Sequence, residues 1–381
     1  MAVESRGLSL VIVQGPVDAT PNRADAPAGR RAAMAVPIMV ALLAVGCEGG
    51  NQPGVVRFGG PTMGASWAVT LVTGAQALDA SESEAVRAAI TEDLARVNAL
   101  MSTWDAGSEL SRFNRSPSLE PFPVAPETFE VLRWAETIAA ETGGAFDITV
   151  GPLVNAWGFG VQDDPEARPD EDEIARARGD TGMHLLELDP DGQWVRKRRP
   201  DVQCDVSALV PGYAADRIAA LLALRGFSNF LVDVGGELVA RGRTEDGVPW
   251  RVAVERPGAS SGRVIERVVS LSDAAVATSG DYRNYHEVDG ERVAHILDPR
   301  TGRPIRHQLA SATVVDSRAV RADALATALM VLGPDEGLAL AERLDVAALL
   351  LVRRPDGGFD TRASARFEAL GVTAPSDPGP R

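Results

Sequence analysis

The chain has 381 residues, of which 45% are apolar and 24% charged, and its formal net charge is −15. That length is enough for two domains or for one large globular body with a substantial core. An acidic surface repels phosphate backbones, so the composition argues against nucleic acid as a general partner. The one basic run, residues 196–199, is short and is predicted to be a solvated hairpin or loop. Cys47 and Cys204 lie in different contexts and are predicted not to pair, with Cys204 a buried free thiol.

The N-terminal segment has the features of a secretory signal. Arg30 and Arg31 precede an apolar stretch, residues 32–46, that is shorter than the ~20 residues a membrane-spanning helix needs. The stretch ends in AVGC, which resembles a bacterial lipobox, so we expect cleavage before Cys47 and lipidation of its sulfur. The alternative is an ordinary signal peptide with a chance cysteine. On the lipobox interpretation, the protein is lipid-anchored on the periplasmic side of the bacterial inner membrane.

Residues 1–46, as signal peptide and N-terminal extension, are therefore left out of the predicted fold, and residues 47–57 form the lipidated cysteine and a tether. Residues 55–73 alternate well enough for two strands. A capping box at Ser81–Glu84 and apolar residues at helical spacing up to Met101 predict a long helix. The acidic, proline-containing residues 163–173 predict an exposed loop. Further helices are predicted over 128–141, 212–224, 322–332 and 336–344, strands over 202–206, 229–234, 250–256, 263–271 and 347–352, and disorder over 374–381.

These elements mix helices and strands without a regular βαβ rhythm, and no GxGxxG motif follows a strand. A Rossmann dinucleotide site is therefore not indicated. The pattern predicts an α+β fold with a single body, either undivided or built as two lobes with a cleft between them.

Six segments are richer in glycine, aspartate, hydroxyl and aromatic residues than plain structure requires. A tight turn explains the first of them, residues 60–67, by itself. Core packing explains the aromatic residues of the third, residues 146–160, as well as a ligand does. In the second, Trp104 follows a long helix in a polar loop, which suits stacking on a flat ring. In the last, Asp323 and Thr327 are four residues apart on one helix face and can offer two oxygens to one hard cation, although alone they read as capping or surface residues. The six segments are residues 60–67, 101–114, 146–160, 205–216, 278–304 and 323–327.

Zinc and haem sites are poorly supported by the sequence. It has four histidines and no CxxC or HExxH motif.

The ordered set of motifs resembles the ApbE family of FAD:protein FMN transferases. The motifs are TMG, SELSRFN, FDITVGPLVNAWGFG, DVSALVPGYAAD, VDVGGE, TSGDYRNY, HILDPRTGRP and DALATAL. The resemblance implies a T-fold-related ApbE-like domain over residues 58–367, followed by a disordered tail over 368–381. It also implies a Mg²⁺-dependent reaction that moves FMN from FAD to a threonine or serine of a target flavoprotein and releases AMP.

The resemblance carries site residues with it. As Mg²⁺ ligands it implies the Ala208 carbonyl, the Asp323 carboxylate and the Thr327 hydroxyl. As FAD contacts it implies Met63, Trp104, Asp105, Asp147, Pro211 and Ile296. Pro211 departs from the family, which usually carries Lys or Glu there, and proline brings neither charge nor N–H, which puts that contact in question.

His295 matches the family position best suited to act as the base or proton shuttle, because an imidazole titrates near neutral pH. The alternative is that it holds Asp298 or a substrate phosphate. Arg283 and Arg300 are predicted to steady phosphate or the acceptor. The expected acceptors are flavoproteins such as periplasm-facing subunits of membrane redox complexes. Two other functions stay open: a Mg²⁺-dependent FAD pyrophosphatase that gives FMN and AMP, and a non-enzymatic FAD-binding lipoprotein.

Overall fold

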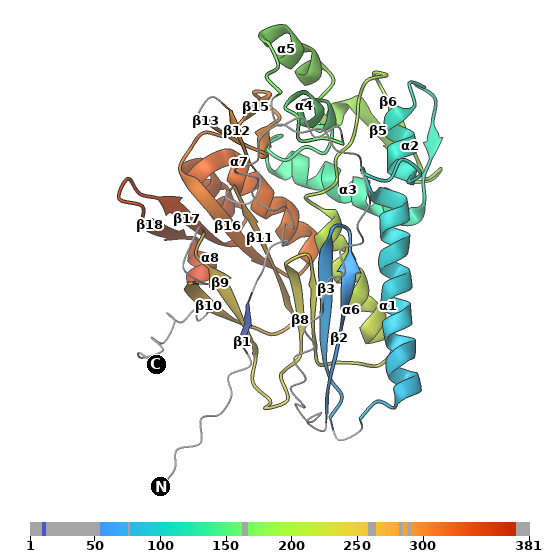
Figure 1. Cartoon of the computed structure of the whole chain (residues 1–381), viewed down its shortest axis with the longest axis vertical. Helices are drawn as coiled ribbons and strands as arrows, with labels where there is room; N and C mark the ends of the chain where they lie inside the picture. The colour runs from blue at the N-terminus through green and yellow to red at the C-terminus, as the bar shows by residue number, and fades with distance from the viewer. Residues whose placement is uncertain are drawn as a thin grey trace, which may run out of the picture.

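The computed structural model describes residues 10–12, 54–74, 77–161, 167–257, 264–281, 285–288 and 291–370. Its centre is an antiparallel sheet of eight strands in the order β18-β17-β16-β11-β8-β7-β3-β2 (Figure 1). The predicted α+β class is therefore confirmed. The strands are β2 (Val55–Thr62), β3 (Ala65–Val72), β7 (Phe230–Val234), β8 (Glu237–Arg241), β11 (Ala274–Gly280), β16 (Leu309–Asp316), β17 (Ala347–Arg353) and β18 (Phe359–Ala363).

Three long helices cover one face of this sheet: α1 (Ala80–Met101), α6 (Val210–Leu224) and α7 (Ala319–Arg343). α6 packs on β7 and β8, and α7 packs on β11, β16 and β17. α7 is long and apolar enough to cross a membrane by length and composition, but most of it is buried in this core. The sequence predicted two helices here, over 322–332 and 336–344. The structure agrees, because α7 consists of two helical segments that meet at a kink at Gly333 (φ 79°), where Pro334 follows and cannot donate an N–H.

The opposite face of the sheet is covered by a smaller layer. It consists of β9 (Trp250–Glu255), β10 (Ile265–Leu271) and α8 (Ala365–Glu368), and its apolar side chains form a second core with those of the large sheet. β1 (Leu10–Ile12) pairs in parallel with β9, Leu10 lying opposite Arg251. These three residues belong to the segment that was left out of the predicted fold, and their backbone adds an edge strand.

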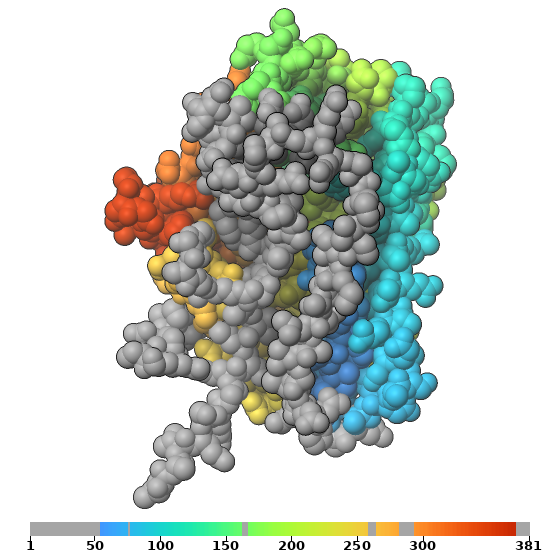
Figure 2. Space-filling model, in the orientation of Figure 1, coloured from blue at the N-terminus to red at the C-terminus, as the bar shows by residue number. Residues whose placement is uncertain are grey.

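A second lobe lies at one end of the molecule (top of Figure 1). Figure 2 shows α1 along one flank below it, with the β18 end of the large sheet on the opposite flank. The elements of the lobe are α2 (Glu109–Arg115), β4 (Phe122–Pro123), α3 (Pro126–Glu141), α4 (Gly151–Ala156), α5 (Glu171–Gly179), η1 (Met183–Leu185), β5 (Leu186–Asp189), β6 (Trp194–Lys197), β12 (Tyr285–Val288), β13 (Glu291–Ala294), β14 (Leu297–Asp298) and β15 (Arg303–Pro304).

Two predicted boundaries were wrong. α1 begins after Asp79, whose carboxylate accepts the Glu82 N–H (2.8 Å) while the Glu82 carboxylate accepts the Asp79 N–H (2.9 Å), so the capping box starts two residues earlier than expected. Part of the predicted acidic loop is the start of α5. There Asp170 caps the helix and residues 171–173 form its first turn, where acidic side chains interact favourably with the helix dipole.

Two smaller expectations also needed correction. The basic run lies in the β5–β6 hairpin as predicted, but its Lys197 is only 2% exposed. Residues 202–206 form no strand and make a single bridge, between Gln203 and Val150. Cys204 is a buried free thiol, and burial raises its pKa to about 12. Cys47 and the tail beyond residue 370 lie outside the described residues.

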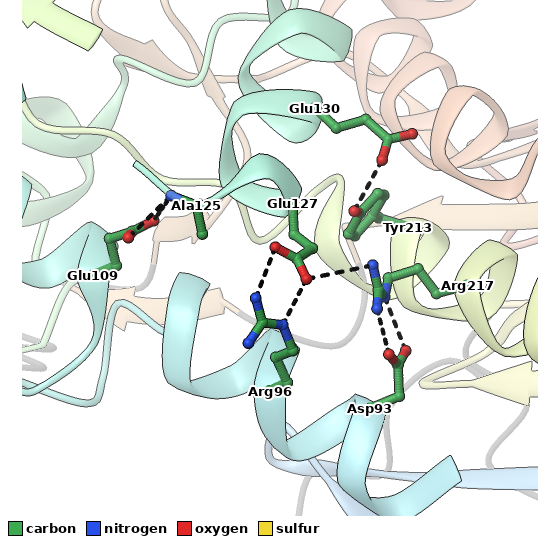
Figure 3. A network of polar contacts seen from close by, with 8 residues as sticks. All are labelled: Asp93, Arg96, Glu109, Ala125, Glu127, Glu130, Tyr213 and Arg217. Atoms are coloured by element: carbon green, nitrogen blue, oxygen red, sulfur yellow. Dashed lines mark hydrogen bonds and ion pairs between the residues drawn. The ribbon is translucent and has the colours of Figure 1, made fainter. Parts of the chain in front are cut away.

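An ion-pair network joins α1, α3 and α6 (Figure 3). Arg217 of α6 donates from Nε to Asp93 of α1 (2.9 Å) and lies 3.9 Å from Glu127 of α3. Arg96 of α1 donates to both carboxylate oxygens of Glu127 (2.5 and 3.1 Å). We refer to these four residues as the helix junction. It ties the helices that cover the sheet to the upper lobe.

Candidate active site

One end of the large sheet brings together several of the motifs. The β2–β3 turn at Met63 (φ 45°) and Gly64 (φ 72°) is tight and left-handed, which glycine tolerates best. The Gly235 N–H donates to the Ser66 carbonyl (2.9 Å), so the β7–β8 turn lies beside the start of β3. Met63 therefore belongs to the same end of the sheet as the VDVGGE motif.

The N-terminus of α6 packs against these two turns. A Cβ added to Gly235 would lie 3.8 Å from the Pro211 Cβ and 3.9 Å from the Ala65 Cβ. Pro211 stands in the first turn of α6, where its missing N–H costs nothing because that donor has no partner within the helix. Pro211 is thus suited to starting the helix, and it brings no polar group to the site.

Asp323 of α7 reaches the same helix end. Its Oδ2 accepts the Gly212 N–H (3.0 Å), and the side chain is 5% exposed. Glycine is needed at 212 because a Cβ there would clash with the Ala319 carbonyl and the Asp323 side chain. Burial raises the pKa of Asp323 to about 7, and the Gly212 hydrogen bond lowers it by less. The hydrogen bonds described for this carboxylate use Oδ2 alone.

Thr327 lies one turn further along α7. Its hydroxyl is 2.9 Å from the Ser279 hydroxyl near the end of β11. Ala208 precedes α6 by two residues, so its carbonyl belongs to the segment that Asp323 approaches. These residues offer a carboxylate, hydroxyls and a backbone carbonyl, the oxygen donors that Mg²⁺ prefers.

Asp323 is the one charged side chain among the residues proposed to hold a cation. Within the described part of the chain, no three His, Cys, Asp or Glu side chains are grouped so as to hold a metal ion. A cation here would therefore be held by one carboxylate with neutral oxygens, and its charge would offset the burial of that carboxylate. The residues present fit Mg²⁺ on these grounds.

The Asp147 carboxylate joins two segments of the upper lobe by hydrogen bonds. Its Oδ1 accepts from the N–H and the hydroxyl of Thr149 (2.8 and 2.5 Å), and its Oδ2 accepts the Met183 N–H (2.8 Å). Thr149 Oγ1 in turn accepts the Gly182 N–H (2.5 Å). Burial raises the pKa of Asp147, and these hydrogen bonds oppose the rise. These hydrogen bonds between residues 147–149 and 182–183 were not predicted from the sequence.

A cavity of about 850 Å³ opens beside Asp147. Its lining includes Arg178, Arg198, Arg300 and His184. Arg300 also donates to both oxygens of Asp298 (2.9 and 3.0 Å). Asp147 is the one predicted FAD contact that lines the cavity. Arg178, Arg198 and His184 were not predicted, since each is an ordinary surface residue in its own stretch of sequence.

His295 and Ile296 lie where two distant motifs pack together. The His295 ring is edge-on to Phe159, with ring centroids 6.4 Å apart. Ile296 is buried, and its carbonyl accepts the Ile305 N–H (3.1 Å). The Trp157 indole donates to the Gly302 carbonyl (2.9 Å), which joins the WGFG motif to the DPRTG turn.

Trp104 and Asp105 lie apart from these contacts, in the turn between α1 and α2. Trp104 is 65% exposed, and the Asp105 carboxylate accepts the Gly107 N–H (2.8 Å). An indole so exposed is available for stacking, as predicted, but the described contacts do not join it to Asp323 or Asp147. Arg283 lies outside the described residues.

The family model of ApbE matches residues 63–350. The chain belongs to the ApbE family. An FAD:protein FMN transferase of Vibrio cholerae serotype O1 is 40% identical over 327 residues, which is 86% of this chain and 95% of that protein. One of Escherichia coli K12 is 38% identical over 344 residues, 88% of this chain and 96% of that protein.

Solved structures of ApbE proteins agree with the fold. Flavin transferase ApbE from Vibrio cholerae is 39% identical with a TM-score of 0.75, covering 83% of this chain and 99% of that one. The apo form of flavinyl transferase ApbE from Pseudomonas stutzeri is 40% identical with a TM-score of 0.76, covering 83% of this chain and 96% of that one. The ApbE assignment thus holds in both sequence and fold.

Proposed function

We propose that the protein transfers FMN from FAD to a threonine or serine hydroxyl of an acceptor flavoprotein, releases AMP and needs Mg²⁺. Its membership of a family of flavin transferases supports the transfer. The observation that carries the metal dependence is the buried Asp323 carboxylate at the N-terminus of α6, with the Thr327 hydroxyl one turn away.

In this proposal Asp323, the Thr327 hydroxyl and the Ala208 carbonyl hold the ion. Mg²⁺, when bound, neutralises charge on the FAD diphosphate and so favours phosphoryl transfer. The three residues supply one negative charge, which leaves a net positive charge for the diphosphate. The N-terminus of α6 adds a partial positive charge at the same place.

His295 takes the proton of the acceptor hydroxyl. The acceptor oxygen forms a bond to the FMN phosphorus, the bond from that phosphorus to the AMP oxygen breaks, and AMP leaves with the electron pair. An imidazole with a pKa near neutrality is suited to this transfer. The ring is held edge-on against Phe159, which limits its motion.

The proposed FAD contacts come from the lining of the cavity and from the family resemblance. Asp147 and the arginines of the 850 Å³ cavity offer a polar, largely cationic wall to an anionic nucleotide. Met63, Trp104, Asp105 and Ile296 are proposed as further contacts from the family resemblance. Pro211 is proposed to contribute shape alone.

The test is a transfer assay with the purified chain, FAD, MgCl₂ and an acceptor domain that carries a threonine in a flavinylation motif. We expect a fluorescent acceptor band on a denaturing gel and one AMP per flavin transferred. Free FMN and AMP without a labelled acceptor would favour the pyrophosphatase alternative. Unchanged FAD would overturn both enzymatic functions and leave a binding protein.

We also propose that Cys47 is lipidated and that the protein works on the periplasmic side of the inner membrane, where its acceptors would be exposed subunits of redox complexes. The basis is the signal and lipobox pattern. Cys47→Ala is expected to move the protein from the membrane fraction to the soluble periplasmic fraction. An unchanged membrane fraction would contradict the anchor.

A further inference from the structure

The side-chain amide of Asn114, at the end of α2, pairs with the backbone of the segment that leads into α6. Asn114 Nδ2 donates to the Cys204 carbonyl (2.8 Å), and Asn114 Oδ1 accepts the Cys204 N–H (2.8 Å). The two bonds go to the peptide groups on either side of the Cys204 Cα, so together they fix the position and orientation of the backbone at this residue. The contact spans 90 residues of sequence.

Asn114 is itself held by a buried cation. The Lys197 ammonium donates to the carbonyls of Asn114 (3.0 Å) and Ser116 (2.9 Å), and it lies 4.9 Å from the Phe113 ring centroid. A positive charge at the C-terminal end of a helix interacts favourably with its carbonyls. The end of α2, and with it the Asn114 side chain, is therefore fixed in place.

The same segment is bound on its other side by residues 148–151. The Asp205 N–H donates to the Ile148 carbonyl (2.6 Å), and the Gly151 N–H donates to the Gln203 carbonyl (3.2 Å). Residues 203–205 thus run between α2 and residues 148–151. Three residues later comes Ala208, followed by the α6 N-terminus that Asp323 contacts.

We propose that Asn114 is a positioning residue for the Ala208 carbonyl, and through it for the divalent cation. This inference rests on the proposed metal site. By fixing the backbone at Cys204, Asn114 sets the direction in which the chain enters α6, and so the distance between the Ala208 carbonyl and Asp323. Removing the amide leaves the carboxylate and the hydroxyl in place but loosens the third oxygen.

The test is a titration of the FAD-bound protein with MnCl₂, in which electron paramagnetic resonance measures the free Mn²⁺. Mn²⁺ suits the same oxygen ligands as Mg²⁺. Asn114→Ala is expected to weaken Mn²⁺ binding about tenfold, the size expected for the loss of such a hydrogen-bonded pair. The MgCl₂ concentration for half-maximal transfer should rise in parallel, while the KM for FAD stays close to that of the wild type.

Asn155→Ala is the matched control. Asn155 also carries an amide that binds this segment, but it donates to the Gln203 side chain (2.9 Å) rather than to the backbone. The Asn155→Ala variant should bind Mn²⁺ as tightly as the wild type does. Asn114→Asp keeps the hydrogen-bond acceptor and loses the donor. Its Mn²⁺ affinity is expected to lie between those of the wild type and Asn114→Ala, and it replaces Asn114→Ala in the test if that variant does not fold.

Each outcome decides the inference. Asn114 variants that bind Mn²⁺ as tightly as the wild type, even with a lower melting temperature, would overturn the positioning role and leave a structural one. An equal loss of Mn²⁺ affinity in Asn155→Ala would also overturn it. A wild-type protein that binds no Mn²⁺ would overturn the metal site itself, whereas wild-type binding without transfer would count against the proposed function alone.

Discussion

The middle and the N-terminus of α6 balance their charges in opposite ways. Near the middle of the helix, Arg217 lies between Asp93 and Glu127, and Arg96 covers the other side of Glu127 (Figure 3). At the N-terminus, Asp323 is buried against a backbone N–H, and its pKa is raised to about 7. The charged side chains of the helix junction are paired with one another. The site buries a carboxylate at a cost in folding free energy, which is what proteins tolerate where a ligand binds.

A second carboxylate near this helix end, that of Asp233, is half-buried. Asp233 of β7 accepts the Gly236 N–H (3.0 Å) at the turn beside the α6 N-terminus, and burial raises its pKa to about 6. In the helix junction, by contrast, hydrogen bonding to Arg96 lowers the pKa of Glu127. The pKa shifts of these three carboxylates thus differ in direction: the pKa is lowered at Glu127 in the helix junction and raised at Asp323 and Asp233 near the N-terminus of α6.

The largest effect is expected from Asp323→Asn. The amide can still accept the Gly212 N–H but carries no charge, so transfer should fall at least about a hundredfold through loss of the cation. The melting temperature without metal should stay the same or rise, because the buried charge is gone. The rate of acceptor labelling and thermal unfolding check both parts; full activity in this variant would refute the metal site.

The next effect is expected from Arg217→Ala in the helix junction. It removes the partner of Asp93 and should lower the free energy of unfolding by about 1 to 2 kcal/mol, since the pair is partly exposed. Transfer per folded molecule should not change. Urea unfolding of Arg217→Ala, Asp93→Ala and the double variant measures the coupling. Strictly additive losses would show that the two side chains do not stabilise the fold as a pair.

A smaller and opposite effect is expected from Asp233→Asn. Because the folded-state pKa of Asp233 lies above its unfolded value, the folded protein binds this proton more tightly, and ionisation between about pH 4 and pH 6 destabilises the wild type. The full pKa difference corresponds to about 3 kcal/mol, which solvent screening reduces because Asp233 is only partly buried. The variant should therefore gain about 1 kcal/mol at pH 7 and nothing below about pH 4. Urea unfolding at both pH values checks this, and equal gains at pH 4 and pH 7 would contradict the assigned cause.

The smallest effect concerns Cys204. With a pKa of about 12 and no exposed sulfur, its thiol should not react with a thiol reagent at pH 8 in the folded protein, and it should react after unfolding in guanidinium. Absorbance of the released thiolate measures this. Rapid reaction of this thiol in the native state, checked with a Cys204→Ser control, would contradict the burial of the segment that Asn114 holds.

The elements predicted well are those in which apolar residues recur at helical spacing or form a continuous run. The helix ending at Met101 follows from apolar residues at helical spacing, and β17 from a run of aliphatic residues. α5 was missed because its nine residues bury only Ile174 and Ala177, too few to make a visible apolar stripe. The capping box of α1 was misplaced because acidic and serine residues stand at several adjacent positions, any of which can cap a helix.

The candidate site was predictable where chemistry is local. Asp323 and Thr327 share a helix face by spacing alone, and the order of the motifs led to the family. The contacts of Asn114 with Cys204 and of Asp147 with Met183 join segments far apart in the chain, and one sequence carries no signal for such pairs. Arg178 and Arg198 of the cavity were missed for the same reason, whereas Arg300 was predicted as a phosphate or acceptor contact.

The most direct measurement is anomalous diffraction from crystals grown with FAD and MnCl₂. A single strong Mn²⁺ peak is predicted within about 2.5 Å of an Asp323 carboxylate oxygen, the Thr327 hydroxyl and the Ala208 carbonyl. A peak elsewhere in the molecule, or none at this place while FAD is bound, would contradict the account.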